Sequence, residues 1–403
     1  MKYFDVIVVG GGAAGFFAAI NLAELNPKLS VAILEKNKEG LQKVKISGGG
    51  RCNVTHAEFI PSELVTHYPR GEKELLGPFH SFMTGDTIEW FEKRGVTLKI
   101  EEDGRMFPES DSSQTIIDCF LSQSKKMGVE IFYKQSLVKV EKEQDLFTLA
   151  TQDSHFTCEK LLVATGSSVK TWKLLETLGH TIIPPVPSLF TFNIKDARIN
   201  SIPGVVANNV EVHILDSNLF SEGPLLVTHW GLSAPAVLKL SAFGALELAN
   251  RDYKFKIEIN FIRQSLEETI DHLKEFKLQL AKKLVHKQSL FDLPKRLWKQ
   301  LVLAAGINED EKWADLTKVQ MENLSEQLTR AQFQVDGKST FKEEFVTAGG
   351  VDLKEINFKT FESKIVKNLY LAGEVINVDA ITGGFNFQNA WTGGFLAAKA
   401  MSQ

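Results

Sequence analysis

Three glycines near the beginning of the 403-residue chain, Gly10, Gly12 and Gly15, have the G-x-G-x-x-G spacing of a dinucleotide site. The apolar run 4–9 before them predicts a buried parallel strand, and residues 13–25 after them predict an apolar helix. Here the first glycine allows a tight turn, the second lets backbone approach a pyrophosphate, and the third lets helix and strand pack closely. The N-terminus of the helix faces the phosphate charge.

An acidic residue follows at the distance that this chemistry requires. Residues 30–34 predict a second strand, and Glu35 closes it twenty residues after Gly15. A carboxylate there accepts hydrogen bonds from a ribose diol, and its charge would repel a 2′-phosphate, which disfavours NADP. A glycine-rich turn without a ligand is the alternative, which the surrounding strand, helix and acid make the weaker one. The motif alone leaves open whether the dinucleotide is FAD or NAD.

A second glycine-rich segment, 47–55, combines three successive glycines with donors such as Ser47, Arg51 and Asn53. Three glycines in a row carry an entropic penalty, so stability does not explain them. A flexible loop is the plain alternative. We interpret the segment as a loop over the cofactor, with Arg51 near phosphate or substrate.

Two later apolar runs complete the same α/β pattern. Residues 161–166 end in a tight turn at Gly166, and 367–374 end in Gly373-Glu374. Both predict further parallel strands that deliver backbone to the same ligand. A Gly-Gly turn then opens a final helix that extends to Ala400. The dinucleotide domain is therefore interrupted and completed at the end of the chain.

The elements between these runs fall into two groups. Residues 129–133, 137–142 and 147–150 predict a small sheet. From about residue 188, the strands 190–194, 210–215, 225–228 and 253–261 predict an antiparallel sheet or small barrel, and 333–345 returns to strand-like texture. Between them, 264–330 predicts several amphipathic helices. A helix beginning at Pro235 is expected to have Ser233 as its cap.

Composition limits the function classes. The chain is 43% hydrophobic and 24% charged with a net charge of −4, which excludes wholesale disorder and gives no overall attraction to nucleic acid or membrane. The three cysteines are unclustered, which argues against a disulfide framework or structural zinc and fits a reducing compartment. No apolar run approaches the ~20 residues of a spanning helix, and the N-terminus leaves no room for a signal peptide. We expect a cytoplasmic protein with no metal site, no membrane partner and no Ser-His-Asp arrangement.

One local charge run is an exception. Lys274 to Lys299 holds eight Lys or Arg residues against two acids, Glu275 and Asp292. A solvated helix face is the plainer interpretation. The functional alternative is a basic patch that binds RNA.

The C-terminal pattern resembles the glutathione-reductase-like flavoproteins. In that group the acid at the Gly-Glu strand end holds the ribityl chain, and the final helix points its N-terminus at the flavin pyrimidine edge. The segments 47–53, 228–236, 346–351 and 373–394 are further similar to the BaiN/RdsA-type, or aminoacetone-oxidase-like, NAD(P)/FAD-dependent oxidoreductases. This chain departs from that pattern at Ser167 and around 376–380.

The resemblance implies an α/β fold, with a Rossmann-like FAD-binding domain (1–188 plus 346–403) and a parallel sheet. It also implies an inserted β-barrel (189–262 plus 331–345) and a helical subdomain (263–330). The expected FAD site contains Gly10, Gly12, Ala13, Ala14, Gly15, Glu35, Lys36, Ser47, Gly48, Gly49, Arg51, Cys52, Asn53, Leu137, Ala164, Thr165, Gly166, Gly373, Glu374, Gly383, Gly384, Phe385, Asn386 and Phe387.

The expected activity is FAD-dependent hydride transfer to or from a small organic substrate, including carbon–carbon double-bond reduction. Cys52 and His229 are candidate proton donors, and a packed thiol or a structural imidazole is the alternative for each. No second G-x-G-x-x-G appears, so a dedicated NAD(P)H domain is not expected. Either NAD(P)H binds transiently over the flavin, or the electrons come from elsewhere. Reduction of uridine in ribosomal RNA to dihydrouridine and non-catalytic flavin binding are the alternative functions.

Overall fold

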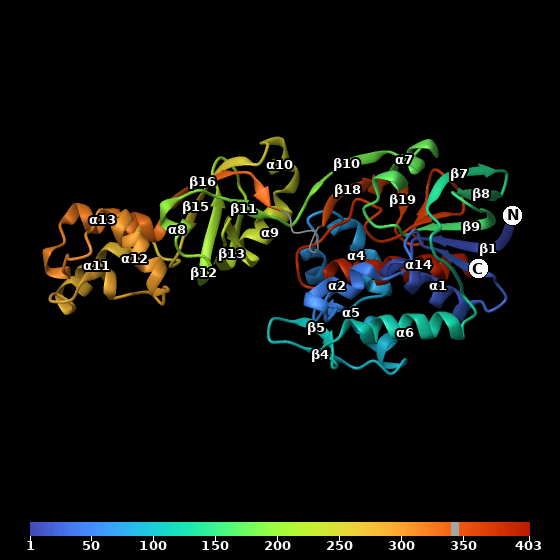
Figure 1. Ribbon diagram of the computed structural model, residues 1–403, viewed down its shortest axis with the longest axis horizontal. Coiled ribbons are helices and arrows are strands. Elements are labelled where there is room, and N and C mark those ends of the chain that lie inside the picture. The colour runs from blue at the N-terminus through green and yellow to red at the C-terminus, as the bar shows by residue number, and fades with distance from the viewer. Residues whose placement is uncertain (340–345) are drawn as a thin grey trace. The chain divides into compact units, whose positions relative to one another are not determined.

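The computed structural model describes residues 1–339 and 346–403. They form two compact units, Met1–Val186 with Val346–Gln403, and Pro187–Phe345. The first unit is assembled from both ends of the chain, and the second is one continuous insertion (Figure 1). The predicted three-part division, with a separate helical subdomain at 263–330, stays a prediction.

A parallel sheet organises the first unit. Its central strands have the order β21 (Leu369–Leu371), β9 (His155–Val163), β1 (Lys2–Val9), β2 (Val31–Leu34) and β6 (Glu130–Phe132). All four pairings are parallel. The chain proceeds from β1 to β2 on one side and later places β9 on the other side. Ligands of α/β folds bind where the strand order reverses in this way, which here is at the carboxyl ends of β1 and β9. The predicted α/β class is confirmed.

The prediction of a separate small sheet at 129–150 was wrong. β6 belongs to the central sheet, and β7 (Leu137–Glu143) pairs with β8 (Leu146–Thr151), which pairs with β9. The physical reason is that β9 is longer than the apolar run at 161–166 indicated, because its first half is partly polar. That half offers β8 an antiparallel edge, with Phe147 opposite Cys158.

Helices from opposite ends of the chain pack beside this sheet. α1 (Ala13–Leu25), α6 (Ser113–Lys126) and α14 (Phe385–Met401) lie together on one side of β1 and β9 (Figure 1). A Cβ at Gly394 of α14 would lie 2.9 Å from the Ala14 carbonyl oxygen of α1. The two helices therefore approach more closely than a larger residue would allow.

The remaining elements of the first unit are α2 (Gln42–Gly50), β3 (Thr55–His56), α3 (Pro61–Leu64), α4 (Glu72–Ser81), α5 (Thr84–Glu92), β4 (Leu98–Ile100), β5 (Arg105–Pro108), α7 (Val169–Thr177), β10 (Ile182–Pro187), β18 (Thr347–Val351), β19 (Ile356–Asn357) and β20 (Glu362–Ser363). They include two small separate sheets, β3-β5-β4 and β10-β18, and two strands, β20 and β19, that extend the central sheet beyond β21.

The second unit contains an antiparallel sheet. In spatial order its strands are β16 (Ala331–Asp336), β15 (Lys254–Asn260), β12 (Val206–Ile214), β13 (Phe220–Val227), β14 (Gly231–Ser233), β11 (Thr191–Asn193) and β17 (Lys338–Ser339). The two edge strands, β16 and β17, are consecutive in the chain. One segment, 331–339, therefore supplies both edges of the sheet. The predicted antiparallel sheet is confirmed, and its assignment as a β-barrel domain stays a prediction. The strand prediction for 333–345 extends beyond β17 into residues outside the described part.

Helices complete the second unit. They are α8 (Ala197–Asn200), α9 (Pro235–Phe243), α10 (Ala245–Asn250), α11 (Leu266–Gln279), α12 (Lys295–Ala304) and α13 (Lys318–Thr329). The sheet and the helices share one hydrophobic core, which includes Trp298 and Trp313. The predicted cap of α9 was wrong, because Ala234 precedes the helix and the Ser233 hydroxyl accepts a hydrogen bond from Thr191 instead.

Among the described residues, no helix combines the length and apolar character that a membrane-crossing segment needs.

Candidate dinucleotide site

The glycine turn after β1 has the geometry that its sequence predicts. Gly10 has φ +111°, and a Cβ there would lie 2.4 Å from the Ala164 carbonyl oxygen. A Cβ at Gly15 would lie 1.9 Å from the Gly10 oxygen. A Cβ at Gly12 would meet no atom within 4 Å. Gly10 and Gly15 are thus required by packing, whereas the backbone at Gly12 borders open space that a ligand can approach.

The N-terminus of α1 faces this open space. Gly12 is the N-cap residue, and no side chain caps the helix. The first amides of an uncapped helix favour an anion through their hydrogen atoms and the helix dipole. A Cβ at Gly373, after β21, would come within 3.3 Å of the Ala14 Cβ. The Gly-Glu segment at the end of the chain therefore borders the first turn of α1.

Glu35 links the glycine turn to the end of β2 by hydrogen bonds. Its Oε2 accepts a hydrogen bond from the Gly11 amide at 2.8 Å, and its Oε1 accepts two from the Asn37 backbone and side chain at 2.8 Å each. The carboxylate is buried. This role is structural, and the predicted contact with a ribose diol stays a prediction, as do contacts at the exposed Lys36 and at Leu137.

The turn after β9 adds a polar group that lacks a protein partner. The Thr165 Oγ1 is buried and makes no hydrogen bond among the described residues. Buried hydroxyls in folded proteins are nearly always paired, so an unpaired one beside an open backbone fits a polar ligand. Gly166 has φ +62°, and a Cβ there would lie 3.6 Å from Glu374 Oε2. The turns after β1, β9 and β21 therefore converge, as predicted.

Lys43 is a residue of this region that the sequence did not indicate. Its ammonium lies 2.5 Å from the Glu374 carboxylate, and the lysine is far more exposed than its partner. The pair joins α2 to the segment after β21, across 331 residues of sequence. A lysine in a polar helical segment carries no pattern that would reveal this contact.

The 47–55 segment begins inside α2 and then leaves the helical conformation. Gly48, Gly49 and Gly50 have φ of +58°, +68° and +85°, and Cβ atoms at Gly49 and Gly50 would meet nothing within 4 Å. The Asn53 Oδ1 is buried without a hydrogen-bond partner among the described residues. A Cβ at Gly384 would lie 2.9 Å from this oxygen. The glycine loop therefore reaches the N-terminus of α14.

Arg51 is engaged with protein groups. Its guanidinium forms an ion pair with Glu101 at 2.6 Å, a second with Asp111 at 3.4 Å, and stacks 3.9 Å from the centre of the Phe107 ring. The prediction that Arg51 lies near phosphate or substrate stays a prediction. The competing carboxylates come from the β4–β5 region, more than forty residues away in sequence.

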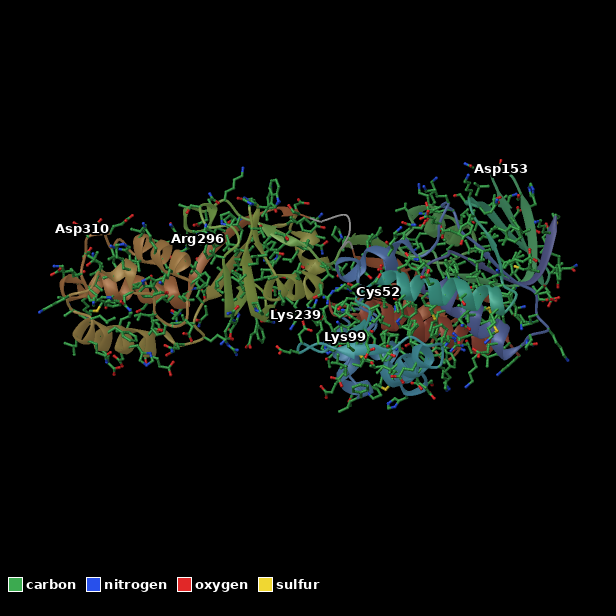
Figure 2. All side chains as sticks on the ribbon, turned by 60° about the horizontal axis from the view of Figure 1, so that its bottom comes forward. Cys52, Lys99, Asp153, Lys239, Arg296 and Asp310 are labelled. Carbon is green, nitrogen blue, oxygen red and sulfur yellow. The ribbon has the colours of Figure 1, made fainter. Side chains whose placement is uncertain are left out.

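Cys52, labelled in Figure 2, is unsuited to the proton-donor role. It is fully buried with φ +62°, and burial raises the pKa of its thiol to about 12 despite the opposing hydrogen bond with Ser47. A group that holds its proton so firmly and reaches no surface exchanges protons slowly. The packed-thiol alternative is the one that the structure supports.

The N-terminus of α14 contains an aromatic stack that the sequence did not indicate. Phe385 packs against the rings of both His56 and His67, with centroid distances of 4.6 Å and 4.1 Å, and the two imidazole centroids are 6.0 Å apart. The Tyr68 hydroxyl donates to the Phe385 carbonyl oxygen at 2.6 Å, and His56 Nδ1 lies 3.1 Å from the Gly383 oxygen. This stack fixes the Gly383–Phe385 turn from the side of β3.

Two further predicted residues of α14 have structural contacts. The Asn386 side chain accepts from the Ala380 amide at 3.0 Å and donates to the Ala380 carbonyl at 3.1 Å. Phe387 stacks on Trp391 with nearly parallel rings. Both polar atoms of the Asn386 side chain close its own loop, and its role in positioning cofactor or substrate stays a prediction.

A Ser-His-Glu line, which the sequence did not predict, lies elsewhere in the first unit. His180 Nδ1 is 2.8 Å from Glu355 and its Nε2 is 3.0 Å from the Ser363 hydroxyl. The Ser363 oxygen also accepts hydrogen bonds from the amides of Ile365 and Val366, and the residue is buried. This serine is a structural link between strands and has no access to a substrate.

The second unit holds His229, in the turn between β13 and β14, and its imidazole is exposed. The expectation that it faces the flavin stays a prediction.

In the 274–299 stretch, Lys274 and Lys299 form ion pairs with Asp271 and Glu309. Lys277 and Arg296 (labelled in Figure 2) donate to backbone carbonyls. Half of the eight cations are thereby engaged, which weakens the RNA-patch interpretation. No cluster suited to a metal ion occurs in residues 1–339 or 346–403.

Comparison with known proteins adds relatives over the full length. The family described as "HI0933-like protein Rossmann domain" matches residues 4–400. A protein of Haemophilus influenzae named "Ribosomal RNA dihydrouridine synthase" is 30% identical, covering 100% of this chain and 99% of the relative. A protein of Clostridium scindens named "3-dehydro-bile acid delta(4,6)-reductase" is 26% identical over 98% of both chains.

Among solved structures, a 3-ketosteroid-delta4-(5alpha)-dehydrogenase from Rhodococcus jostii RHA1 superposes with a TM-score of 0.55. Its sequence is 12% identical, and the match covers 100% of this chain and 97% of that one. This likeness concerns the fold.

Proposed function

Because the chain belongs to the HI0933-like Rossmann-domain family, we propose that it is an FAD-dependent oxidoreductase that reduces a carbon–carbon double bond of a small organic substrate. The observation that carries the proposal is the open cradle at Gly12, bounded by the uncapped N-terminus of α1 and the unpaired Thr165 hydroxyl. These groups fit a pyrophosphate and its neighbouring polar atoms.

The part of the site that is built from the C-terminal segment of the chain favours FAD over NAD. Gly373-Glu374 borders α1, and the N-terminus of α14 at Gly384 reaches the 47–53 loop within the same unit. A helix N-terminus without a side-chain cap stabilises negative charge on a flavin ring. When bound, the flavin supplies hydride transfer, and the protein groups bind, orient and exclude water.

Double-bond reduction is the chemistry shared by the names of the relatives. Dihydrouridine is uridine with its ring double bond saturated, and a delta(4,6)-reductase likewise saturates carbon–carbon bonds. In both, the double bond is conjugated with a carbonyl group. We propose the same bond type here, with NAD(P)H as a transient electron donor. A cytoplasmic location stays a prediction, supported by three free cysteines, all of them buried.

Reduction of uridine in ribosomal RNA is the second candidate. It is favoured by two full-length relatives with that name, at 30% and 29% identity. The partly neutralised 274–299 stretch does not add support. If RNA is the substrate, its affinity should fall steeply between low and physiological salt, since phosphate contacts release counterions.

The first test is anaerobic absorbance of the purified protein before and after adding NADH or NADPH. We expect flavin bands near ~370 and ~450 nm that nicotinamide bleaches, followed by reoxidation on adding a conjugated enone or a uridine-containing RNA. A protein that is colourless and takes up no FAD would refute the flavin assignment. A flavin that no donor reduces would support non-catalytic flavin binding instead.

A further inference from the structure

Lys43 brings a positive charge to the place where the turns after β1, β9 and β21 converge. It is the second residue of α2, and its ammonium lies 2.5 Å from the Glu374 carboxylate. The contacted oxygen, Glu374 Oε2, lies 3.6 Å from the position of a Cβ at Gly166, in the turn after β9. The neighbouring Gly373 borders the first turn of α1. The ammonium therefore lies beside the turns that surround the N-terminus of α1.

The start of α2 is bonded to the glycine turn after β1. The amide of Leu41, the residue that precedes α2, donates to the Gly11 carbonyl oxygen at 2.7 Å. A Cβ at Gly40 would lie 2.9 Å from the same oxygen, so a side chain there would collide with the turn. The backbone of Lys43 is thus anchored two residues away, whereas its side chain is 57% exposed and keeps the freedom to change partners.

The charges around these turns require a cation before an anionic ligand can bind. Glu35 is buried, with its Oε2 at 2.8 Å from the Gly11 amide, and the Glu374 side chain is only 15% exposed. Two carboxylates therefore border the site at which a pyrophosphate would add two further negative charges. Like charges repel strongly where water is partly excluded, and a helix N-terminus supplies only about half an elementary charge.

Lys43 is better suited to supply this charge than the arginine of the same segment. The Arg51 guanidinium is engaged by two carboxylates, those of Glu101 and Asp111. Lys43 forms an ion pair with Glu374 in which the lysine is more than half exposed. Such a pair adds little to folding stability, because water competes for the charges and the lysine loses rotamer freedom. Replacing the carboxylate by a phosphate is therefore not opposed by the fold.

We propose that the Lys43 ammonium is the counter-charge of the cofactor pyrophosphate, and that it exchanges Glu374 for phosphate oxygens when FAD binds. The inference rests on the proposed function, because it takes FAD to be the ligand of the open cradle at Gly12. The exchange leaves the Glu374 carboxylate free to accept hydrogen bonds from hydroxyl groups of the cofactor. Lys43 is a binding and positioning residue, and it takes no part in hydride transfer.

The experiment titrates the full-length apoprotein with FAD and follows flavin fluorescence. Lys43→Gln should weaken FAD binding about tenfold, as expected for loss of one charge-assisted contact, and Lys43→Arg should retain most of the affinity. Raising the salt concentration from about 50 to about 500 mM should weaken FAD binding to the wild type much more than to Lys43→Gln, because salt screens a contact between charges. Urea unfolding of the Lys43→Gln apoprotein should match the wild type, since the ion pair is half exposed.

Lys45→Gln is the matched control. Lys45 is another exposed lysine of α2, two residues later and therefore roughly 200° further round the helix. This variant changes the net charge by the same amount and should keep the wild-type affinity for FAD. A second comparison tests whether Lys43 acts only by holding Glu374 in place. In that case Lys43→Gln would have no further effect in a Glu374→Gln protein, whereas we expect the same loss of about tenfold in that background.

Three results would each overturn the proposal: wild-type FAD affinity in Lys43→Gln, an equal loss in Lys45→Gln, or a Lys43→Gln effect that disappears in the Glu374→Gln background. A failure of the proposed function would look different. If the wild-type protein takes up no FAD, the inference fails together with the proposed function. If it binds FAD with the dependence on Lys43 described above, but the reduced flavin never passes electrons to a conjugated double bond, only the proposed reaction fails.

Discussion

Substitution of Gly12 by alanine separates folding from cofactor binding. Gly12 has φ −99° and ψ −166°, an extended conformation that alanine adopts readily, and its missing Cβ faces open space. The substitution therefore removes no protein contact. Its effect on stability should be a gain of about 0.4–1 kcal/mol, because alanine restricts the unfolded chain more than glycine does.

The effect on FAD affinity should have the opposite sign. A methyl group at Gly12 enters the space through which a pyrophosphate would approach the uncapped amides of α1. Loss of one charge-assisted hydrogen bond corresponds to about 1.5–3 kcal/mol. The dissociation constant should therefore rise roughly 10- to 150-fold.

The assay has two parts: urea unfolding of the apoprotein, and titration of the apoprotein with FAD followed by flavin fluorescence. Gly77→Ala in α4 is the control, since a Cβ there also meets nothing within 4 Å and Gly77 does not have a positive φ. It should leave FAD affinity unchanged. Wild-type FAD affinity in Gly12→Ala would refute the assignment of this turn to the pyrophosphate. Unfolding of that variant would refute the claim that the space is open.

Three further predictions concern buried groups. Glu35→Gln should lower the free energy of unfolding of the apoprotein by about 1–3 kcal/mol, measured in urea, because an amide cannot accept all the N–H groups that now face the carboxylate, Gly11 among them. An unchanged unfolding curve would contradict that role. Asp379→Asn should lower it by about 3–5 kcal/mol, because the substitution removes the buried carboxylate that forms an ion pair with the nearly buried Arg70; if the double variant with Arg70→Leu is no more stable than the single one, this reason fails. Cys52→Ala should leave the bleaching of the flavin by NAD(P)H unchanged. In the native protein the pKa of the Cys52 thiol is raised to about 12, so this thiol should resist a disulfide reagent at neutral pH and react only after unfolding. Rapid labelling of Cys52 in the native protein would show that it reaches solvent.

Local sequence pattern predicted the part of the site in which contacts are close in sequence. Gly10, Gly15 and Glu35 belong to one strand–helix–strand unit, so spacing alone determines which atoms meet. The structure shows the two close backbone approaches expected at Gly10 and Gly15, whereas the hydrogen bond from Gly11 to Glu35 was not predicted. The sequence also predicted that the ends of β9 and β21 meet the turn after β1, because the carboxyl ends of parallel strands lie at the same edge of a sheet.

Contacts between distant side chains could not be predicted in this way. Arg51 forms an ion pair with Glu101, and Phe385 packs against both His56 and His67, although nothing in the local composition distinguishes these residues from their neighbours. The length of β9 was missed for a related reason. Its first half is only partly buried, and a search for apolar runs detects a strand only where both faces are covered.

The contact between Gly394 and α1 also constrains how the protein is made. Ribosomes deliver residues 13–25 early and residues 385–401 late, after the whole insertion 187–345 has emerged. The surface of α1 that α14 covers must therefore stay uncovered through most of synthesis. Because domains fold as units during translation, the insertion can fold before the unit that surrounds it. Until then the apolar surface of the first helix is exposed, and exposed apolar surface favours aggregation.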